Sequence, residues 1–283
     1  MTDTPKKNSS LKTRLITAFT LIPLLIAVLA IGGWFAMIAA AACLGIALYE
    51  ELSTLKSGGY RPVWWPAFAA LGIGIALILL HKTTLILPSM VALMFAVQLC
   101  VMRREDPQIT DIVFSILPLL TVAAPGLCLI GLLDTQPRAL QLMLLLFAFA
   151  TSIGCDTMAY FAGTIIGGPK LCPHISPKKT IAGAVGGLFG SVLFALLVDL
   201  GFRWLVPDFT SGMPLYWTIG LGLVCGVVAQ MGDLFASMLK RHCKVKDFGH
   251  IFPGHGGMMD RLDSILFTSI IVYCYRAILL GLI

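Results

Sequence analysis

Charged side chains are scarce in this sequence. Lysine, arginine, aspartate and glutamate make up only 12% of the 283 residues, and 58% of the residues are hydrophobic. Soluble domains average about 25% charged and about 45–50% apolar residues. One globular core cannot bury such a surplus of apolar side chains, so the composition excludes an ordinary soluble domain. It predicts an all-α fold, a polytopic transmembrane helical bundle.

Paired cysteines are also absent. The eight cysteines are scattered singly, mostly within apolar runs, and none forms a Cys-x-x-Cys pair. This spacing argues against a disulfide framework, and we interpret the thiols as small buried hydrophobes. A zinc site remains an alternative, because five possible ligands are predicted on one side of the membrane: Cys172, His174, His242, Cys243 and His255.

Internal repeats of 20–50 residues and low-complexity tracts are missing too. We interpret the chain as a basic cytoplasmic tail, residues 1–14, and a single membrane domain, residues 15–283. The first apolar run lacks a closing Ala-x-Ala site, so we expect an uncleaved span rather than a signal peptide. Nine spans are predicted, at about 15–31, 34–49, 63–80, 84–102, 110–133, 139–165, 181–203, 215–239 and 262–282. Pro118 and Pro125 should bend the fifth of these.

The cations are distributed unevenly between the predicted loops. Sixteen of the twenty lysines and arginines fall on the side of the N-terminus, and the exceptions are Lys82, Arg138, Arg203 and Arg276. Under the positive-inside rule, the N-terminus and these charged loops are predicted to be cytoplasmic. Nine spans then place the C-terminus outside.

Glycines spaced four residues apart recur within the apolar segments. The pairs are 163/167, 183/187 and 222/226. Such pairs let transmembrane helices approach closely. We therefore predict helix packing at these positions and assign no chemistry to them.

The densest group of charges lies at residues 237–263, between two apolar runs. On a helix, Asp233, Ser237, Lys240 and Arg241 would share one face, because they are spaced i, i+4, i+7 and i+8. A carboxylate at membrane depth is unfavourable unless it is paired or hydrated, so Asp233 is a functional candidate. Ordinary interfacial cations do not share a helix face with an intramembrane aspartate.

Asp260 and Asp263 are three residues apart at the start of the last predicted span. Both carboxylates would project from one first helical turn, where the helix dipole favours anions. Paired oxygen ligands suit Mg²⁺, which usually shares its coordination shell with substrate phosphates. The preceding Pro-Gly-His-Gly-Gly turn, residues 253–257, leaves backbone N–H groups free to approach an anion.

A second charged loop, residues 176–187, also leads into a helix. Lys178 and Lys179 supply positive charge there, and Thr180 supplies either a helix cap or a ligand. Asp156 lies in the middle of an apolar segment and is a further functional candidate, although a hydrogen bond to a neighbouring helix would also account for it.

These motifs resemble the signature of the phosphatidate cytidylyltransferase (CDP-diacylglycerol synthase) family. The resemblance is carried by Ser237-x-Leu239-Lys240-Arg241, Lys246-Asp247-x-Gly249, Phe252-Pro253-x-His255-Gly256-Gly257 and Asp260-Arg261-x-Asp263. Upstream, Asp156-Thr157-x-Ala159-Tyr160 and Ser176-Pro177-Lys178-Lys179-Thr180 extend it over at least residues 152–267. Where many members have Trp-Glu-Gly, this chain has Ile181-Ala182-Gly183. That departure weakens the case that this loop binds substrate through a carboxylate.

The resemblance implies Mg²⁺-dependent transfer of CMP from CTP to phosphatidate, with release of pyrophosphate. It places the catalytic part at about residues 152–267 and the active site on the cytoplasmic face of a bacterial inner membrane. The implied partners are CTP, phosphatidate and the bilayer, with no nucleic acid, and a homodimer is compatible with the pattern.

The resemblance also implies residue roles. Asp233, Asp260 and Asp263 would hold the metal, and the catalytic group would be Asp233, Asp260, Lys240 and Arg241. Asp247 would orient Lys246 or Arg241, and His255 would either bond a phosphate or shape the turn. The implied substrate-binding residues are Lys178, Lys179, Thr180, Ser237, Lys246, Asp247, His255, Gly256, Gly257 and Arg261.

Two other functions remain as alternatives. A CDP-alcohol phosphotransferase also uses aspartates and Mg²⁺ at the membrane, but its Asp-Gly-x-x-Ala-Arg pattern is missing here. A proton- or cation-coupled transporter would use Asp156 and Asp233 as relay groups. That reading explains the intramembrane acids but leaves the basic segment after them without a role.

Overall fold

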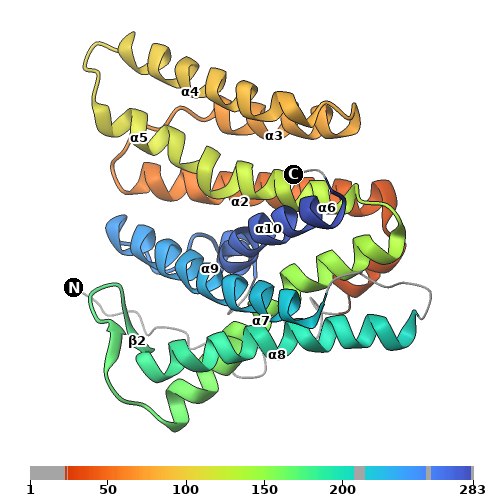
Figure 1. Ribbon diagram of the computed structural model, residues 1–283. Coiled ribbons are helices and arrows are strands. Elements are labelled where there is room, and N and C mark those ends of the chain that lie inside the picture. The colour runs from red at the N-terminus through yellow and green to blue at the C-terminus, as the bar shows by residue number, and fades with distance from the viewer. Residues whose placement is uncertain (1–22, 24, 207–213, 253–255, 282–283) are drawn as a thin grey trace.

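The computed structural model describes residues 23, 25–206, 214–252 and 256–281. The chain folds into stacked helices, with α10 in the middle of the bundle, α3 and α4 at one end and α7 and α8 at the other (Figure 1). The helices are α2 Gly33–Ser57, α3 Trp65–Leu79, α4 Ile86–Met102, α5 Ile109–Pro118, α6 Ala124–Leu133, α7 Arg138–Ile165, α8 Ile181–Leu205, α9 Leu215–His242 and α10 Met259–Leu279. The predicted helical membrane bundle is confirmed.

Seven helical stretches in the described part of the chain are long and apolar enough to cross a membrane. Helix α3, with 15 residues, is shorter than these. Eight of the nine predicted segments correspond to helical stretches between α2 and α10. Most of the first predicted segment, 15–31, lies outside the described residues, although residues 25–31 are helical.

Two predicted spans end too early. Helix α2 continues beyond residue 49 to Ser57, and α9 continues beyond residue 239 to His242. The apolar pattern stops before the helix does, because charged residues at a membrane edge do not break a helix. Lys240, Arg241 and His242 occupy the last turn of α9, where cations are favoured by the negative end of the helix dipole.

The fifth span is interrupted as its prolines predict. Helix α5 ends at Pro118, a short π-helix covers Leu119–Ala123, and α6 begins at Ala124 with Pro125 in its first turn. The π-helix is stabilised from outside, because the Thr121 hydroxyl donates to both carboxylate oxygens of Glu51 at 2.8 and 2.9 Å.

Two short strands join α7 to α8. Strand β1 (Lys170–Cys172) pairs antiparallel with β2 (Ser176–Thr180), in the register Lys170↔Thr180 and Cys172↔Ser176. Thr180 then caps α8, because its hydroxyl accepts a hydrogen bond from the Gly183 N–H at 3.0 Å. In Figure 1 this hairpin, the α2–α3 connection and the α4–α5 connection all lie on the left of the view, on one side of the stacked helices. The charged loops therefore gather on one side, as their cations predict.

Close packing at the glycine pairs is confirmed for five of the six positions. A Cβ atom at Gly183 would lie 2.9 Å from the Ala159 carbonyl oxygen, and one at Gly222 would lie 2.7 Å from Val192 Cα. Gly167 is the exception, because it follows α7 with φ +67° and no side chain or other element lies within 4 Å of its Cβ position. Its role is to end the helix rather than to pack it.

Gly222→Ala should destabilise the α8–α9 contact. The added methyl group would meet the backbone of α8, and overpacking of this kind typically lowers stability by about 1–3 kcal/mol. Gly220→Ala is the matched control, because it lies in the same helix with no atom within 4 Å of its Cβ position. The test is thermal unfolding of the detergent-purified variants, with a lower midpoint expected only for Gly222→Ala. Equal midpoints for the two variants would contradict the packing role.

Candidate active site

An ion pair between β2 and α9 marks the first part of the site. Lys179 Nζ lies 2.5 Å from Asp233 Oδ2, and both side chains are about one quarter exposed, at 27% and 29%. Ser237, one turn further along α9, donates to Asp233 Oδ1 at 3.5 Å. The spacing that placed Asp233 and Ser237 on one face is thereby confirmed, and Lys179 is joined to them from a distant segment.

A cavity of about 370 Å³ opens beside this pair. Its polar lining includes Asp156 from α7, Lys178 and Lys179 from β2, and Gln230 and Asp233 from α9. Asp156 interacts electrostatically with Asp233, Lys179 and Arg261. The structure therefore brings the upstream motif and the α9 motif together around one space, and Asp156 belongs to it.

A second ion pair joins α9 to α10. Lys240 Nζ lies 2.6 Å from Asp260 Oδ1, with side-chain exposures of only 11% and 4%. The other oxygen of Asp260 accepts the backbone N–H groups of Phe248 at 2.8 Å and Gly257 at 2.9 Å. Lys240 also lies over the Phe248 ring, 5.1 Å from its centroid. Asp260 thus closes the loop between α9 and α10 onto the helix that precedes it.

Asp263 on α10 interacts with members of both ion pairs. It is buried, and its Oδ1 accepts the Ser264 backbone N–H at 2.7 Å. It interacts electrostatically with Asp233, Lys240 and Asp156. The close approach is made possible by Gly232, whose Cβ position would lie 2.6 Å from the Asp263 carbonyl oxygen. The packing of α9 against α10 therefore brings the buried Asp263 into electrostatic contact with Asp233 and Asp156, the two acidic residues of the cavity lining.

Several of the predicted site residues are not gathered at the cavity. Arg241 and Lys246 are exposed, and the one hydrogen bond described for Arg241 runs to the Val245 carbonyl oxygen at 3.3 Å. Arg261 is also exposed, but it interacts electrostatically with Asp156 of the cavity lining. Asp247 forms no hydrogen bond or ion pair within the described part of the chain, so the expected contact with Lys246 or Arg241 is not made. His255 lies outside the described residues.

The turn glycines have a steric role. Gly256 has φ +83°, and a Cβ atom there would lie 2.8 Å from Asp260 Oδ2. At Gly257 a Cβ atom would collide with the carboxylate of Glu50. These two glycines let the backbone lie directly against acidic side chains, and the Gly257 N–H donates to the Asp260 carboxylate.

Glu50 on α2 is the residue that the sequence reasoning missed. Its side chain is buried, and its Oε2 accepts the Met259 N–H at 2.8 Å, at the start of α10. Its Oε1 is buried without a hydrogen-bond partner in the described structure. Thr54, one turn further along α2, donates to the Phe248 carbonyl oxygen at 3.4 Å. The sequence did contain a signal for Glu50, since two adjacent glutamates, Glu50 and Glu51, follow an apolar run directly. It was missed because the predicted span ended at residue 49, which placed both glutamates outside the helix.

The zinc alternative finds no support. No group of three or more His, Cys, Asp or Glu side chains in the described ranges could hold a metal ion as it stands. Cys243 is buried against Gly58, and burial raises the pKa of its thiol, which disfavours the thiolate that zinc requires. His242 is engaged elsewhere, in a 2.5 Å hydrogen bond with the Tyr60 hydroxyl.

Comparison with known proteins matches this chain to one family. The model of the cytidylyltransferase family matches residues 12–279. A phosphatidate cytidylyltransferase of Staphylococcus aureus (strain COL) is 35% identical over 265 residues, which cover 91% of this chain and 96% of that protein. A phosphatidate cytidylyltransferase of Brucella abortus biovar 1 (strain 9-941) is 39% identical over 138 residues, 47% of each chain.

Glu50→Gln should loosen the start of α10. The carboxylate is a charged acceptor, and a hydrogen bond to a charged group is worth about 1.5–3 kcal/mol. We expect amide exchange of residues 256–262 to accelerate at least about tenfold, which corresponds to about 1.4 kcal/mol. Hydrogen–deuterium exchange with mass spectrometry measures this.

Glu105→Gln is the matched control for that experiment, because Glu105 is exposed and no hydrogen bond or ion pair is described for its side chain. It should leave exchange unchanged throughout. If Glu50→Gln matched this control, the contact with Met259 would not hold the turn in place.

Proposed function

The chain belongs to the cytidylyltransferase family and is a nucleotidyltransferase, and from this premise we propose that it transfers CMP from CTP to phosphatidate. A phosphate oxygen of phosphatidate forms a bond to the α-phosphorus of CTP. The bond from that phosphorus to the β-phosphate oxygen breaks, pyrophosphate leaves with its electron pair, and CDP-diacylglycerol remains in the membrane. The names of the relatives from Staphylococcus aureus and Brucella abortus support this assignment.

The residues at the cavity suit this chemistry. A phosphate monoester is largely dianionic near neutral pH, its second pKa being about 6, so the nucleophile needs no strong general base. The reaction needs neutralisation of negative charge and in-line positioning. Lys178 and Lys179 provide positive charge at the cavity, and Asp233 holds Lys179 in place through the 2.5 Å ion pair. That ion pair beside the cavity is the observation that carries the proposal.

A lipid substrate fits the position of the cavity. Among its lining residues is Tyr160, which is 69% exposed. Further exposed apolar side chains follow on the same two helices, Phe161 and Ile165 on α7 and Ile181 and Val185 on α8. An aqueous surface would not favour so many exposed apolar groups, whereas acyl chains would. A headgroup in the cavity could therefore keep its chains in the bilayer.

Mg²⁺ is the second part of the proposal. Asp233 and Asp263 offer carboxylate oxygens from neighbouring helices, with Asp156 nearby, and we assign the first two as protein ligands. Asp233 pairs with Lys179 through Oδ2 and keeps Oδ1 for the ion, whereas both oxygens of Asp260 are engaged, one by Lys240 at 2.6 Å and the other by two backbone N–H groups. When bound, the ion supplies charge neutralisation on the phosphates and polarises the reacting phosphorus. Asp260 and Lys240 would act indirectly, by holding the α9–α10 loop in place.

The transporter alternative loses its main argument. It rested on Asp156 and Asp233 as isolated intramembrane acids, but Asp233 is paired with Lys179 and both aspartates line a cavity with two lysines. The family match over residues 12–279 also favours the transferase. Activity in detergent micelles distinguishes the two, because transport requires a sealed vesicle.

The reaction can be tested with purified protein, phosphatidate and CTP labelled at the α-phosphate. We expect a labelled lipid in the presence of Mg²⁺, no labelled lipid after EDTA, and recovery when Mg²⁺ is restored. Diacylglycerol in place of phosphatidate should give no product, because it lacks the phosphate nucleophile. Full turnover in thoroughly chelated buffer would refute the metal assignment, and absence of labelled lipid in every condition would refute the reaction.

Asp233→Asn should lower kcat at least about a hundredfold, the loss expected when one main electrostatic stabiliser, worth about 2.7 kcal/mol or more, is removed. The asparagine keeps the size but gives up both the Lys179 ion pair and a metal ligand. Kinetics are compared at equal amounts of folded, extracted protein, with Mg²⁺ titrated for each variant.

Glu105→Gln serves as the control for charge removal. Asp199 is unsuitable for that purpose, because it is buried in an ion pair with Arg203 and accepts a hydrogen bond from Thr218. An Asp233→Asn variant that kept more than a tenth of the wild-type kcat would remove Asp233 from the catalytic centre.

A further inference from the structure

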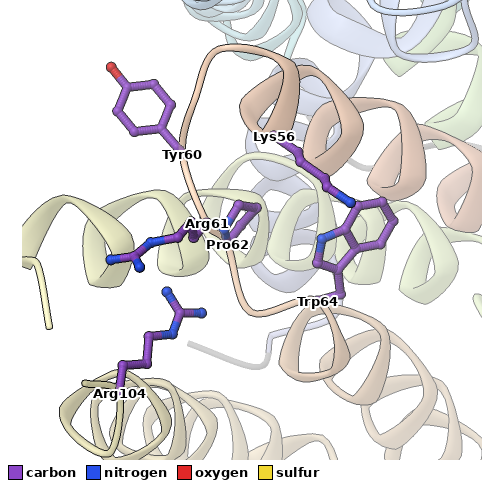
Figure 2. A pocket seen from close by; sticks show the side chains of 6 residues that line it. All are labelled: Lys56, Tyr60, Arg61, Pro62, Trp64 and Arg104. Carbon is purple, nitrogen blue, oxygen red and sulfur yellow. The ribbon is translucent and has the colours of Figure 1, made fainter. Parts of the chain in front are cut away.

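A second pocket lies at the cation-rich end of the bundle, outside the site described above. Figure 2 shows its lining, which comes from the end of α2, the α2–α3 connection and the residues after α4. The cavity has a volume of about 240 Å³. The lining residues are Lys56, Tyr60, Arg61, Pro62, Trp64 and Arg104. None of them belongs to the motifs that carry the family resemblance.

The two arginines are held in fixed positions by a buried carboxylate. Asp111 Oδ2 lies 2.7 Å from Arg104 and 3.1 Å from Arg61, and the Asp111 side chain is only 3% exposed. Arg61 also donates to the Asp106 carbonyl oxygen at 2.8 Å, and the exposed Asp106 carboxylate lies 3.8 Å away. In Figure 2 the two guanidinium groups lie close to each other on one side of the pocket. The arginines are therefore positioned before any ligand arrives.

The remaining charge is positive. Lys56, Arg61 and Arg104 contribute three positive charges, and Asp111 and Asp106 contribute two negative charges, so one positive charge is left. Lys56 is exposed and has no carboxylate partner among the described residues. A singly charged anion such as a phosphodiester would balance this excess.

The aromatic side chains of the pocket are also fixed. The ring of Tyr60 packs against Phe114 in a tilted arrangement, with centroids 3.9 Å apart, and its hydroxyl forms a 2.5 Å hydrogen bond with His242. Trp64 contacts Tyr49 edge to face, with centroids 5.5 Å apart. The walls of the pocket are thus tied to α5, α9 and α2, and binding would require little reorganisation.

On the bilayer side of the pocket, aromatic side chains are exposed. Tyr49 lies two helical turns before Lys56 on the same face of α2 and is 58% exposed, and Trp65 is 50% exposed. Tryptophan and tyrosine concentrate where the bilayer meets water, with their rings at headgroup level. A ligand held by the cations would therefore have lipid directly beneath it.

We propose that this pocket binds the phosphodiester headgroup of an anionic membrane phospholipid, with its acyl chains along Tyr49 and Trp65. Basic pockets between transmembrane helices on the cation-rich side are suited to such headgroups. The cavity is smaller than the 370 Å³ space beside Asp233. Its single excess positive charge also suits a phosphodiester better than a nucleoside triphosphate. The bound lipid is a ligand and not a substrate, because it carries no phosphate monoester.

Native mass spectrometry of the full chain in detergent tests this site. Phosphatidylglycerol is titrated as the anionic probe and phosphatidylcholine as the zwitterionic one. We expect wild-type protein to bind the first phosphatidylglycerol at least about fivefold more tightly than phosphatidylcholine. Lys56→Gln should abolish this preference, because it removes the unpaired cation. Lys82→Gln, an exposed lysine at the other end of α3, should retain it.

Further variants separate this pocket from the cavity beside Asp233. Lys179→Gln should keep the phosphatidylglycerol preference, and Arg104→Gln should lose it, because it removes the excess positive charge. Asp111 keeps its ion pair with Arg61 in this variant, so that no buried carboxylate is left without a partner. Retention of the preference in both Lys56→Gln and Arg104→Gln would overturn the proposal. Loss of the phosphatidylglycerol preference in Lys179→Gln would also overturn the proposal, because it would assign the lipid to the cavity beside Asp233.

Competition with inorganic phosphate is the last test. At millimolar concentration it should not displace phosphatidylglycerol, because most of the lipid's binding surface is apolar. Complete displacement would identify the pocket as a site for free phosphate and overturn its assignment to a lipid.

Discussion

The ion pair between Lys240 and Asp260 is the interaction on which the candidate site depends. Two charges buried to 11% and 4% exposure lose most of their hydration, and a buried pair is tolerated only when the remaining polar atoms are also satisfied. Asp260 meets that condition, because its second oxygen accepts two backbone N–H groups of the α9–α10 loop. The pair therefore fixes three segments at once: the end of α9, the loop and the start of α10.

The N-terminal half of the bundle supports this arrangement although it carries no motif. Glu50 holds the first turn of α10, Thr54 contacts the loop at Phe248, and Glu51 accepts the hydroxyl of Thr121 in the π-helix. Helix α2 is thus part of the scaffold of the site rather than a membrane anchor alone. Lys56, in the last turn of the same helix, lines the second pocket, so one element borders both regions.

Much of the fold and part of the site follow from sequence pattern. The spans, the break at Pro118 and Pro125, the helix face shared by Asp233 and Ser237, and the placement of Asp260 and Asp263 in the first turns of α10 all depend on local periodicity. Close packing at the glycine pairs was also predictable, except at Gly167. The four-residue spacing does not distinguish a glycine that packs against another helix from one that ends its own helix. The ends of α2 and α9 could not be predicted in this way, because hydropathy marks the residues within the hydrocarbon core and does not show that the helix continues beyond it.

The sequence by itself determined a membrane-embedded helical protein, the gathering of its cations on one side and the residues that carry the family resemblance. Only the tertiary structure decided which charges meet. Lys179 pairs with Asp233 across 54 residues of chain, and Lys240 pairs with Asp260. Glu50 reaches Met259 across 209 residues. Such pairings depend on how helices pack in three dimensions, and helical spacing constrains only neighbours within a few turns.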